Sequence, residues 1–188
     1  MSTTAETPQV LPHAYPLDDF YAQQGLKLPP IAVISSDDVP QPYHSLLVHD
    51  GDMTPPLEYF HGGRLQLTVL RRQQRGEYCF REIILTRECD DAPVLFGATK
   101  ISLDYFPTLA RQDLLLERSP LGRILVDHRV RYTSNPKAYL RVDPDDFIRQ
   151  ALKVTGESTL YGRRNTLWDP DLMPLAEMVE ILPPEPRN

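Results

Sequence analysis

The sequence predicts an α+β protein, in which helices accompany antiparallel strands. Three stretches in the middle of the chain, residues 65–70, 78–86 and 93–103, have the apolar patterns of strands, and only short, turn-like segments connect them. Strands joined in this way pair as antiparallel neighbours. Helical patterns occur before and after them, and a chain of 188 residues, 41% hydrophobic and 24% charged, is long enough for one domain with its own core.

Residues 1–42 are predicted to form a proline-rich arm that is extended or partly disordered. Prolines recur throughout this segment, and only residues 18–24 have the composition for a helical turn or two. Such a segment buries little apolar surface on its own. We therefore place the domain at residues 43–188.

Within the domain, helices are predicted on both sides of the three strands. Residues 43–49 are expected to form one short helix, and residues 55–60 another, with proline in its first turn and a glycine pair at its end. After the third strand, residues 105–118 have leucines at helical spacing, and residues 120–125 add a further helical turn.

The last part of the chain is predicted to contain strands and one helix. Short strands at 129–132 and 138–142 flank a turn at 134–136. Asp143 as N-cap and Pro144 at the first helical position predict a helix of about ten residues. The chain closes with a hairpin made of two strands and the turn between them: residues 159–168, 169–171 and 173–182.

The composition argues against several classes of function. A formal net charge of -6 and a pI of about 5.3 argue against a nucleic-acid surface, which needs a basic field. The sequence has no run of about 18 apolar residues that would span a membrane, and its first residues lack the regions of a signal peptide, so we expect a cytoplasmic protein. The cysteines and histidines have no spacing typical of a disulfide framework or a metal site, and we expect no metal.

Arg81 lies in an otherwise apolar strand, and this position calls for an anion. A guanidinium does not lose its proton, so a buried one needs a negatively charged partner. Side chains alternate along a strand, which places Arg81 on one face with Ile83 and Leu85. Glu180 has a similar position in the last strand, and Glu177 lies on the opposite face of that strand. Arg81 and a carboxylate of the last strand form either a structural ion pair or the two ends of a polar small-molecule cavity.

Five short motifs occur in the same order as in a known enzyme family. They are Asp52-Met53-Thr54, Arg81-Glu82-Ile83-Ile84-Leu85, Pro120-Leu121-Gly122, Tyr161-Gly162-Arg163-Arg164 and Glu180-Ile181-Leu182-Pro183. With this order and spacing, residues 45–184 resemble the chorismate pyruvate-lyase family, whose members form 4-hydroxybenzoate from chorismate.

The resemblance implies a single α+β domain, with an antiparallel sheet of about six strands and with helices and flap segments that cover a closed ligand cavity. It also implies a carbon–oxygen lyase that needs no cofactor. In the family, the positions of Met53, Arg81, Leu121 and Glu180 contact the aromatic acid. Arg81 would clamp the ring carboxylate through its planar fork. Glu180, with a pKa raised by burial, would act as general acid on the departing ether oxygen or hold the phenol, and Glu177 is the alternative to it.

One position departs from the family pattern. The family carries an arginine in the third strand, where this chain has Ala98. Lys100 lies two residues further along the same strand face. We expect Lys100 either to take over substrate binding there or to be a solvated surface lysine.

A second hypothesis is a non-catalytic protein of the same fold that binds or senses small aromatic acids. In this it is similar to the effector-binding domains attached to some bacterial transcription regulators. Those regulators carry a winged-helix domain, and residues 1–42 are too short and too rich in proline to form one, which favours the lyase. Under either hypothesis we expect a small aromatic acid or chorismate as the partner, no nucleic acid, no membrane span and a monomer.

Overall fold

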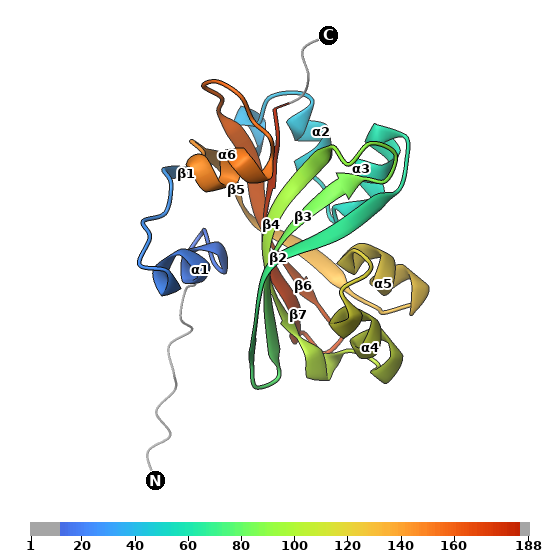
Figure 1. Cartoon of the computed structure of the whole chain (residues 1–188). Coiled ribbons are helices and arrows are strands. Elements are labelled where there is room, and N and C mark those ends of the chain that lie inside the picture. The colour runs from blue at the N-terminus through green and yellow to red at the C-terminus, as the bar shows by residue number, and fades with distance from the viewer. Residues whose placement is uncertain (1–11, 185–188) are drawn as a thin grey trace.

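Seven antiparallel strands form one sheet in the computed structural model, which describes residues 12–184 (Figure 1). Their order across the sheet is β1-β5-β6-β7-β4-β3-β2. The α+β class and the single antiparallel sheet are confirmed, with one strand more than the expected number of about six. The strands are β1 Ile31–Ile34, β2 Leu65–Arg75, β3 Tyr78–Arg87, β4 Pro93–Ser102, β5 Thr133–Val142, β6 Leu160–Trp168 and β7 Pro174–Leu182.

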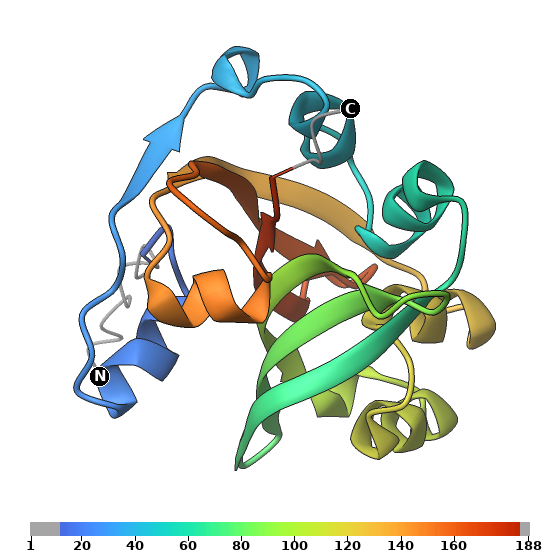
Figure 2. The ribbon, with the colours of Figure 1, turned by 45° about the horizontal axis from the view of Figure 1, so that its top comes forward.

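Helices cover both faces of the sheet, as Figures 1 and 2 show. Helices α2 to α5 pack on the face that carries Arg81 and Ile83, which we call the cavity face. Helices α1 and α6 pack on the face that carries Phe96 and Ile181, which we call the distal face. Among residues 12–184, no helix is long and apolar enough to cross a membrane. The helices are α1 Leu17–Gln23, α2 Tyr43–Leu47, α3 Thr54–His61, α4 Thr108–Leu116, α5 Leu121–Asp127 and α6 Asp146–Ala151, with 3-10 turns η1 Ser36–Asp38 and η2 Leu103–Tyr105.

The predicted central strands and the C-terminal hairpin are confirmed. β2, β3 and β4 follow one another as antiparallel neighbours, and β6 pairs with β7. β4 also pairs with β7, which places Gly97 beside Glu180. This pairing joins the two halves of the sheet, so motifs far apart in the sequence lie side by side.

One continuous strand, β5, replaces the two short strands predicted around residues 134–136. It pairs with β6, and its register shifts between Pro136 and Ala138. A shift of this kind accommodates proline inside a strand, because proline has no backbone N–H for the ladder. Residues 129–132, also predicted as a strand, lie outside β5.

The helix predicted from Asp143 begins later and is shorter than expected. The side chain of Asp145 is its N-cap and accepts a hydrogen bond from the Ile148 amide at 2.9 Å. The amide of Asp143 instead donates to the Pro30 carbonyl at 3.0 Å, so this residue still belongs to the extended backbone beside β1. Both aspartates are good caps, and only the β1–β5 pairing decides between them.

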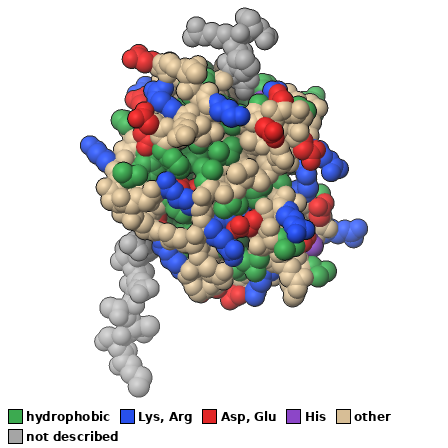
Figure 3. Space-filling model, in the orientation of Figure 1, with side chains coloured by type: hydrophobic (Ala, Val, Ile, Leu, Met, Phe, Trp, Pro, Cys, Tyr) green, Lys and Arg blue, Asp and Glu red, His purple; other side chains and the backbone are tan. Residues whose placement is uncertain are grey.

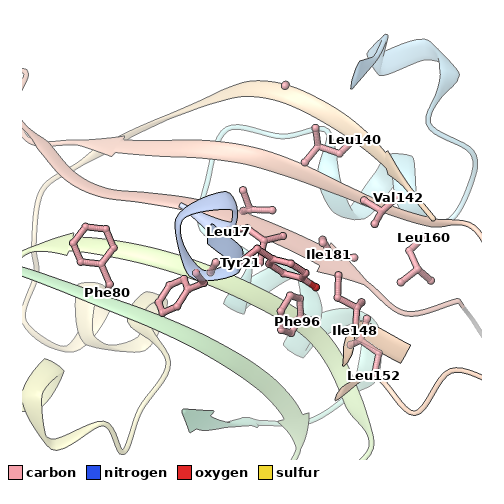
Figure 4. Close-up of a cluster of buried hydrophobic side chains, with 14 residues drawn as sticks. Leu17, Tyr21, Phe80, Phe96, Leu140, Val142, Ile148, Leu152, Leu160 and Ile181 are labelled. Carbon is pink, nitrogen blue, oxygen red and sulfur yellow. The ribbon is translucent and has the colours of Figure 1, made fainter. Parts of the chain in front are cut away.

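Residues 12–42 differ from the expected arm because they contribute to the core. β1 pairs with β5 at one edge of the sheet. From α1, the side chains of Leu17, Phe20 and Tyr21 are at most 2% exposed and enter the hydrophobic cluster of the distal face (Figure 4). Residues 1–11 of the predicted arm lie outside the described residues.

Replacing Leu17 with alanine tests whether α1 is part of this core. Leu17 is fully buried, so its truncation leaves a cavity, and we expect the free energy of unfolding to fall by about 2–5 kcal/mol. Urea unfolding followed by circular dichroism measures the change. Leu26→Ala is the control, because Leu26 is 53% exposed in the same segment and should cost less than about 0.5 kcal/mol. Equal stability of the two variants would show that the segment is a peripheral arm after all.

Candidate functional site

A cavity of about 30 Å³ lies between the sheet and the segments that begin α3 and α5. A cavity of this volume has room for about one or two water molecules, so a larger ligand has to push its walls apart. Strands β3, β4 and β7 supply one wall, and residues 52–54 and 120–121 supply the other. The lining residues are Asp52, Met53, Thr54, Ile83, Leu85, Leu95, Gly97, Thr99, Pro120, Leu121, Met178 and Glu180.

Three of the predicted site residues meet at this cavity. Met53, Leu121 and Glu180 come from three distant parts of the chain, and all three are among its lining residues. Arg81 lies next to it on the cavity face, because its cross-strand neighbour on β4 is Thr99, which lines the cavity. A larger hollow of about 780 Å³ has a lining without any predicted site residue.

Arg81 is buried without an acidic partner among residues 12–184. Figure 3 shows positive and negative side chains interspersed on the surface, whereas Arg81 is only 1% exposed. Its Nη1 donates to the Leu114 carbonyl of α4 at 3.3 Å, its Nε has no hydrogen-bond partner, and it forms no ion pair. Burial lowers the pKa of Arg81, the direction expected for a cation that leaves water without a counter-ion. The structural ion pair considered from the sequence is therefore not formed.

Two further polar groups lie close to this guanidinium. The hydroxyl of Thr99 is buried at the cavity wall and has no hydrogen-bond partner among the residues that the structure describes. Glu117, just after α4, attracts Arg81 from a distance but is paired directly with Arg72 at 3.4 Å. Since buried polar groups are usually hydrogen-bonded, the Nε of Arg81 and the Thr99 hydroxyl mark positions for polar atoms of a ligand.

Glu180 lies at the other end of the cavity and is paired with Arg163. The Nε of Arg163 donates to Oε2 of Glu180 at 2.7 Å. Burial raises the pKa of Glu180 to about 6, although Arg163 acts in the opposite direction, and the charge of Asp52 adds to the rise. Asp52 is itself buried, and its Oδ1 accepts a hydrogen bond from the Thr54 amide at 2.8 Å. This end of the cavity is rich in acceptors, while the Arg81 end offers donors.

Lys100 and Glu177 lie on the distal face, away from the cavity. The Nζ of Lys100 is 3.1 Å from Oε2 of Glu177 and 4.4 Å from the centre of the Tyr78 ring. Arg164 also pairs with Glu177, at 3.4 Å. Side chains alternate along β4, so Lys100 shares the face of Ala98 and not that of Thr99. The structure thus places both residues outside the cavity, where Lys100 was considered for substrate binding and Glu177 was the alternative to Glu180.

Gly122 allows α5 to approach the opposite wall of the cavity. A Cβ atom at this position would overlap with Oδ1 of Asp52 and with the Thr54 hydroxyl. The motif Pro120-Leu121-Gly122 thus places Leu121 in the lining and keeps the next position small. Sequence reasoning singled out Leu121 but not Gly122 or Thr99, since neither close approach nor strand register can be read from one sequence.

The apolar residues between the two polar ends define the kind of ligand that fits. Ile83 of β3 is the cross-strand neighbour of Gly97, and Met178 of β7 is that of Thr99, so these two apolar side chains of the lining lie between Arg81 and Glu180. An apolar body with an anionic group at one end and a hydrogen-bond donor at the other matches this order. In the described part of the chain, no three His, Cys, Asp or Glu side chains are grouped so that they could hold a metal ion.

Solved structures share this fold at low sequence identity. The effector domain of PhnF from Mycobacterium smegmatis matches with a TM-score of 0.53 and 13% identity, over 71% of this chain and 88% of that domain. A second structure of PhnF matches with a TM-score of 0.52 and 13% identity, and 64% of that chain is covered. The gene product SA0254 from Staphylococcus aureus subsp. aureus N315 matches with a TM-score of 0.51 and 9% identity, over 63% of this chain and 82% of that one. No family model and no curated protein matches the sequence.

The raised pKa of Glu180 predicts a specific pH dependence of stability. Because the folded state holds this proton more tightly than the unfolded state, the contribution of Glu180 to stability falls as pH rises from 4.5 to about 6. That rise in pKa corresponds to about 2 kcal/mol. Glutamine does not titrate, so we expect Glu180→Gln to lack this pH-dependent fall in stability. The free energy of unfolding of the variant, minus that of the unaltered protein, should therefore increase between pH 4.5 and about 6. Urea unfolding at several pH values measures it, and a pH-independent difference would contradict the assignment.

Proposed function

We propose that this protein binds or senses a small aromatic hydroxy acid in the cavity of the sheet, with the carboxylate on Arg81 and the hydroxyl at Glu180. The observation that carries the proposal is the buried and unpaired guanidinium of Arg81 beside that cavity. An effector domain is among the solved structures that share the fold, and this supports a binding role.

The carboxylate is assigned to the Arg81 end on grounds of charge. A buried guanidinium loses its hydration, and an anion that arrives with the ligand compensates for that loss. Its planar fork can bond both oxygens of one carboxylate, which a lysine ammonium cannot do. The nearby Thr99 hydroxyl can donate a further bond to the same group.

The hydroxyl is assigned to the Glu180 end on grounds of hydrogen bonding. Arg163 donates to Oε2 of Glu180, which leaves Oε1 to accept from a ligand. A phenol hydroxyl is a donor of suitable reach, and a flat ring fits between the apolar side chains of the lining. 4-Hydroxybenzoate has these three parts in the required order and serves as the probe.

Binding has to open the cavity, because a benzoate is larger than the present volume of about 30 Å³. The wall that carries Leu121 begins α5, and α4 contacts Arg81 through one carbonyl. These helices are joined by residues 117–120, where Glu117 has a left-handed backbone with φ of 55°. Displacement of this helix pair would admit a ligand and then close over it.

The chorismate pyruvate-lyase reaction is the second candidate, and the buried Glu180 favours it. A carboxyl with a pKa of about 6 can give and recover a proton near neutral pH. In the reaction the ether C–O bond to the ring breaks, and the ring carbon that bears the hydroxyl loses a proton, which can restore the acid group. The products are 4-hydroxybenzoate and enolpyruvate, and the latter tautomerises to pyruvate. Glu180 would protonate the departing oxygen. Chorismate carries two carboxylates, and the lining residues supply no second cation, so binding without turnover is our first candidate.

Arg81→Met tests the carboxylate assignment. We expect the unaltered protein to bind 4-hydroxybenzoate at pH 7 and to bind the uncharged 4-hydroxybenzyl alcohol much more weakly. Loss of the charged hydrogen bonds should weaken 4-hydroxybenzoate binding by about 10- to 100-fold in the variant. Isothermal titration calorimetry measures both ligands.

Lys100→Met is the matched control, because Lys100 is a partly buried cation on the distal face and its loss should leave the affinity unchanged. Equal weakening by both substitutions would contradict the assignment. Incubation with chorismate separates the two candidate functions. Release of pyruvate by the unaltered protein, lost in Glu180→Gln, would establish the lyase, whereas binding without pyruvate would support sensing.

A further inference from the structure

Arg163 connects Glu180 to residues 47–51, the segment that leads into α3 and the cavity wall. Its side chain is 0% exposed and comes from β6, directly opposite Glu180 on β7. Beyond its bond to Glu180, its Nη1 donates to the carbonyls of Leu47 and His49 at 3.3 and 3.1 Å. Its Nη2 donates to the carbonyl of Gly51 at 2.7 Å. All three nitrogens of this guanidinium are therefore used.

The segment bound by Arg163 leads directly into the lining of the cavity. Gly51 is followed by Asp52, Met53 and Thr54, which form one wall. Residues 48–51 belong to no helix or strand. Three hydrogen bonds from Arg163 of β6 and one from the Ser134 hydroxyl of β5 to the Gly51 carbonyl, at 3.3 Å, attach this part of the chain to the strands. Movement of Arg163 would therefore change both the wall and the carboxylate that faces it.

A purely structural ion pair between Arg163 and Glu180 does not need the additional bonds from Arg163 to backbone carbonyls. The neighbouring Arg164 pairs with Glu177 on the distal face, and within residues 12–184 its side chain donates to no loop carbonyl and does not line the cavity. A buried ion pair by itself adds little stability, because desolvation offsets the attraction. Through its three bonds to carbonyls, Arg163 contacts the segment at residues 47–51, which Arg164 does not.

We propose that Arg163 is a positioning residue: it keeps Glu180 ionised as an acceptor for the ligand hydroxyl and holds the wall at residues 47–54 against the sheet. The inference rests on the proposed binding of an aromatic hydroxy acid. Without Arg163, a buried carboxylate loses its counter-ion, and its proton is held to higher pH. The wall loses three hydrogen bonds at the same time.

Other charged and titratable groups face the same end of the cavity. Asp52 acts on Glu180 from the start of α3 and favours its protonated form. His49 lies beside Arg163, and burial together with that cation lowers the pKa of His49, which favours the neutral ring. Tyr132 and Tyr139 also lie near Arg163, and burial raises the pKa of each, so they stay uncharged near neutral pH. Glu180 is thus the group near Arg163 whose charge changes around pH 6.

The pH profile of 4-hydroxybenzoate binding is the first readout. In the unaltered protein the affinity should fall on acidification as Glu180 takes up its proton. In Arg163→Met the midpoint of this fall should move upward by about one to three pH units. Arg164→Met removes the adjacent cation of the same strand and should leave the midpoint in place. Glu180→Gln combined with Arg163→Met should abolish the transition.

Hydrogen exchange of the unliganded protein is the second readout and does not depend on any ligand. Amides of residues 47–54 should exchange at least about tenfold faster in Arg163→Met than in Arg164→Met, since only the former loses the carbonyl bonds. If Arg163→Met does not fold, Arg163→Lys keeps the charge but not the fork, and it should retain the pH midpoint while still speeding exchange.

The outcomes separate the two proposals. Binding by the unaltered protein with an unchanged pH midpoint in Arg163→Met would overturn the role of Arg163 and leave the proposed function standing. Unchanged exchange of residues 47–54 would overturn the attachment of the wall. Absence of 4-hydroxybenzoate binding by the unaltered protein would overturn the proposed function and the ligand-directed part of this inference, while faster exchange would still support the attachment.

Discussion

Alternation of side chains along the strands sorts the buried charges of this sheet into two sets. On the distal face, Lys100 and Arg164 share the carboxylate of Glu177, and Glu82 pairs with Arg71. On the cavity face, Arg163 pairs with Glu180, but Arg81 has no carboxylate partner in the described part of the chain. A one-residue shift of register would exchange the faces and pair these groups differently. The unpaired arginine, the cavity beside it and the acceptors at its far end all depend on this register.

The sequence was sufficient to identify the three central strands and the C-terminal hairpin, but not β1, and β5 only in part. Period-two patterns located β3 and β7, and parity grouped Arg81 with Ile83 and Leu85. The structure then shows that this face and the face of Glu180 are the same one. Parity along one strand does not give the pairing between strands. The register of β3 against β4 includes an irregularity between Leu85 and Thr86, which no pattern in the sequence reveals. The sequence also does not say which face of β4 meets the cavity, so Lys100 was considered for substrate binding although it lies on the distal face.

The N-terminal segment shows a second limit. Prolines are frequent there, yet α1 supplies Leu17, Phe20 and Tyr21 to the core, and β1 completes the sheet. Each of these elements is too short to be stable alone, and contacts with β5 and α6 from the far end of the chain stabilise them. Local composition describes the isolated segment correctly but does not contain its long-range partners. For the same reason the roles of Gly122 and Thr99 at the cavity can be recognised only in the folded protein.

The position of the ligand relative to Arg81 is the central claim, and a crystal structure of the protein with 4-hydroxybenzoate tests it most directly. We expect the carboxylate within hydrogen-bond distance of the Arg81 guanidinium, the hydroxyl beside Glu180, and Lys100 still paired with Glu177. Electron density for the ligand outside this cavity, with the Arg81 guanidinium still lacking an anion, would contradict the account.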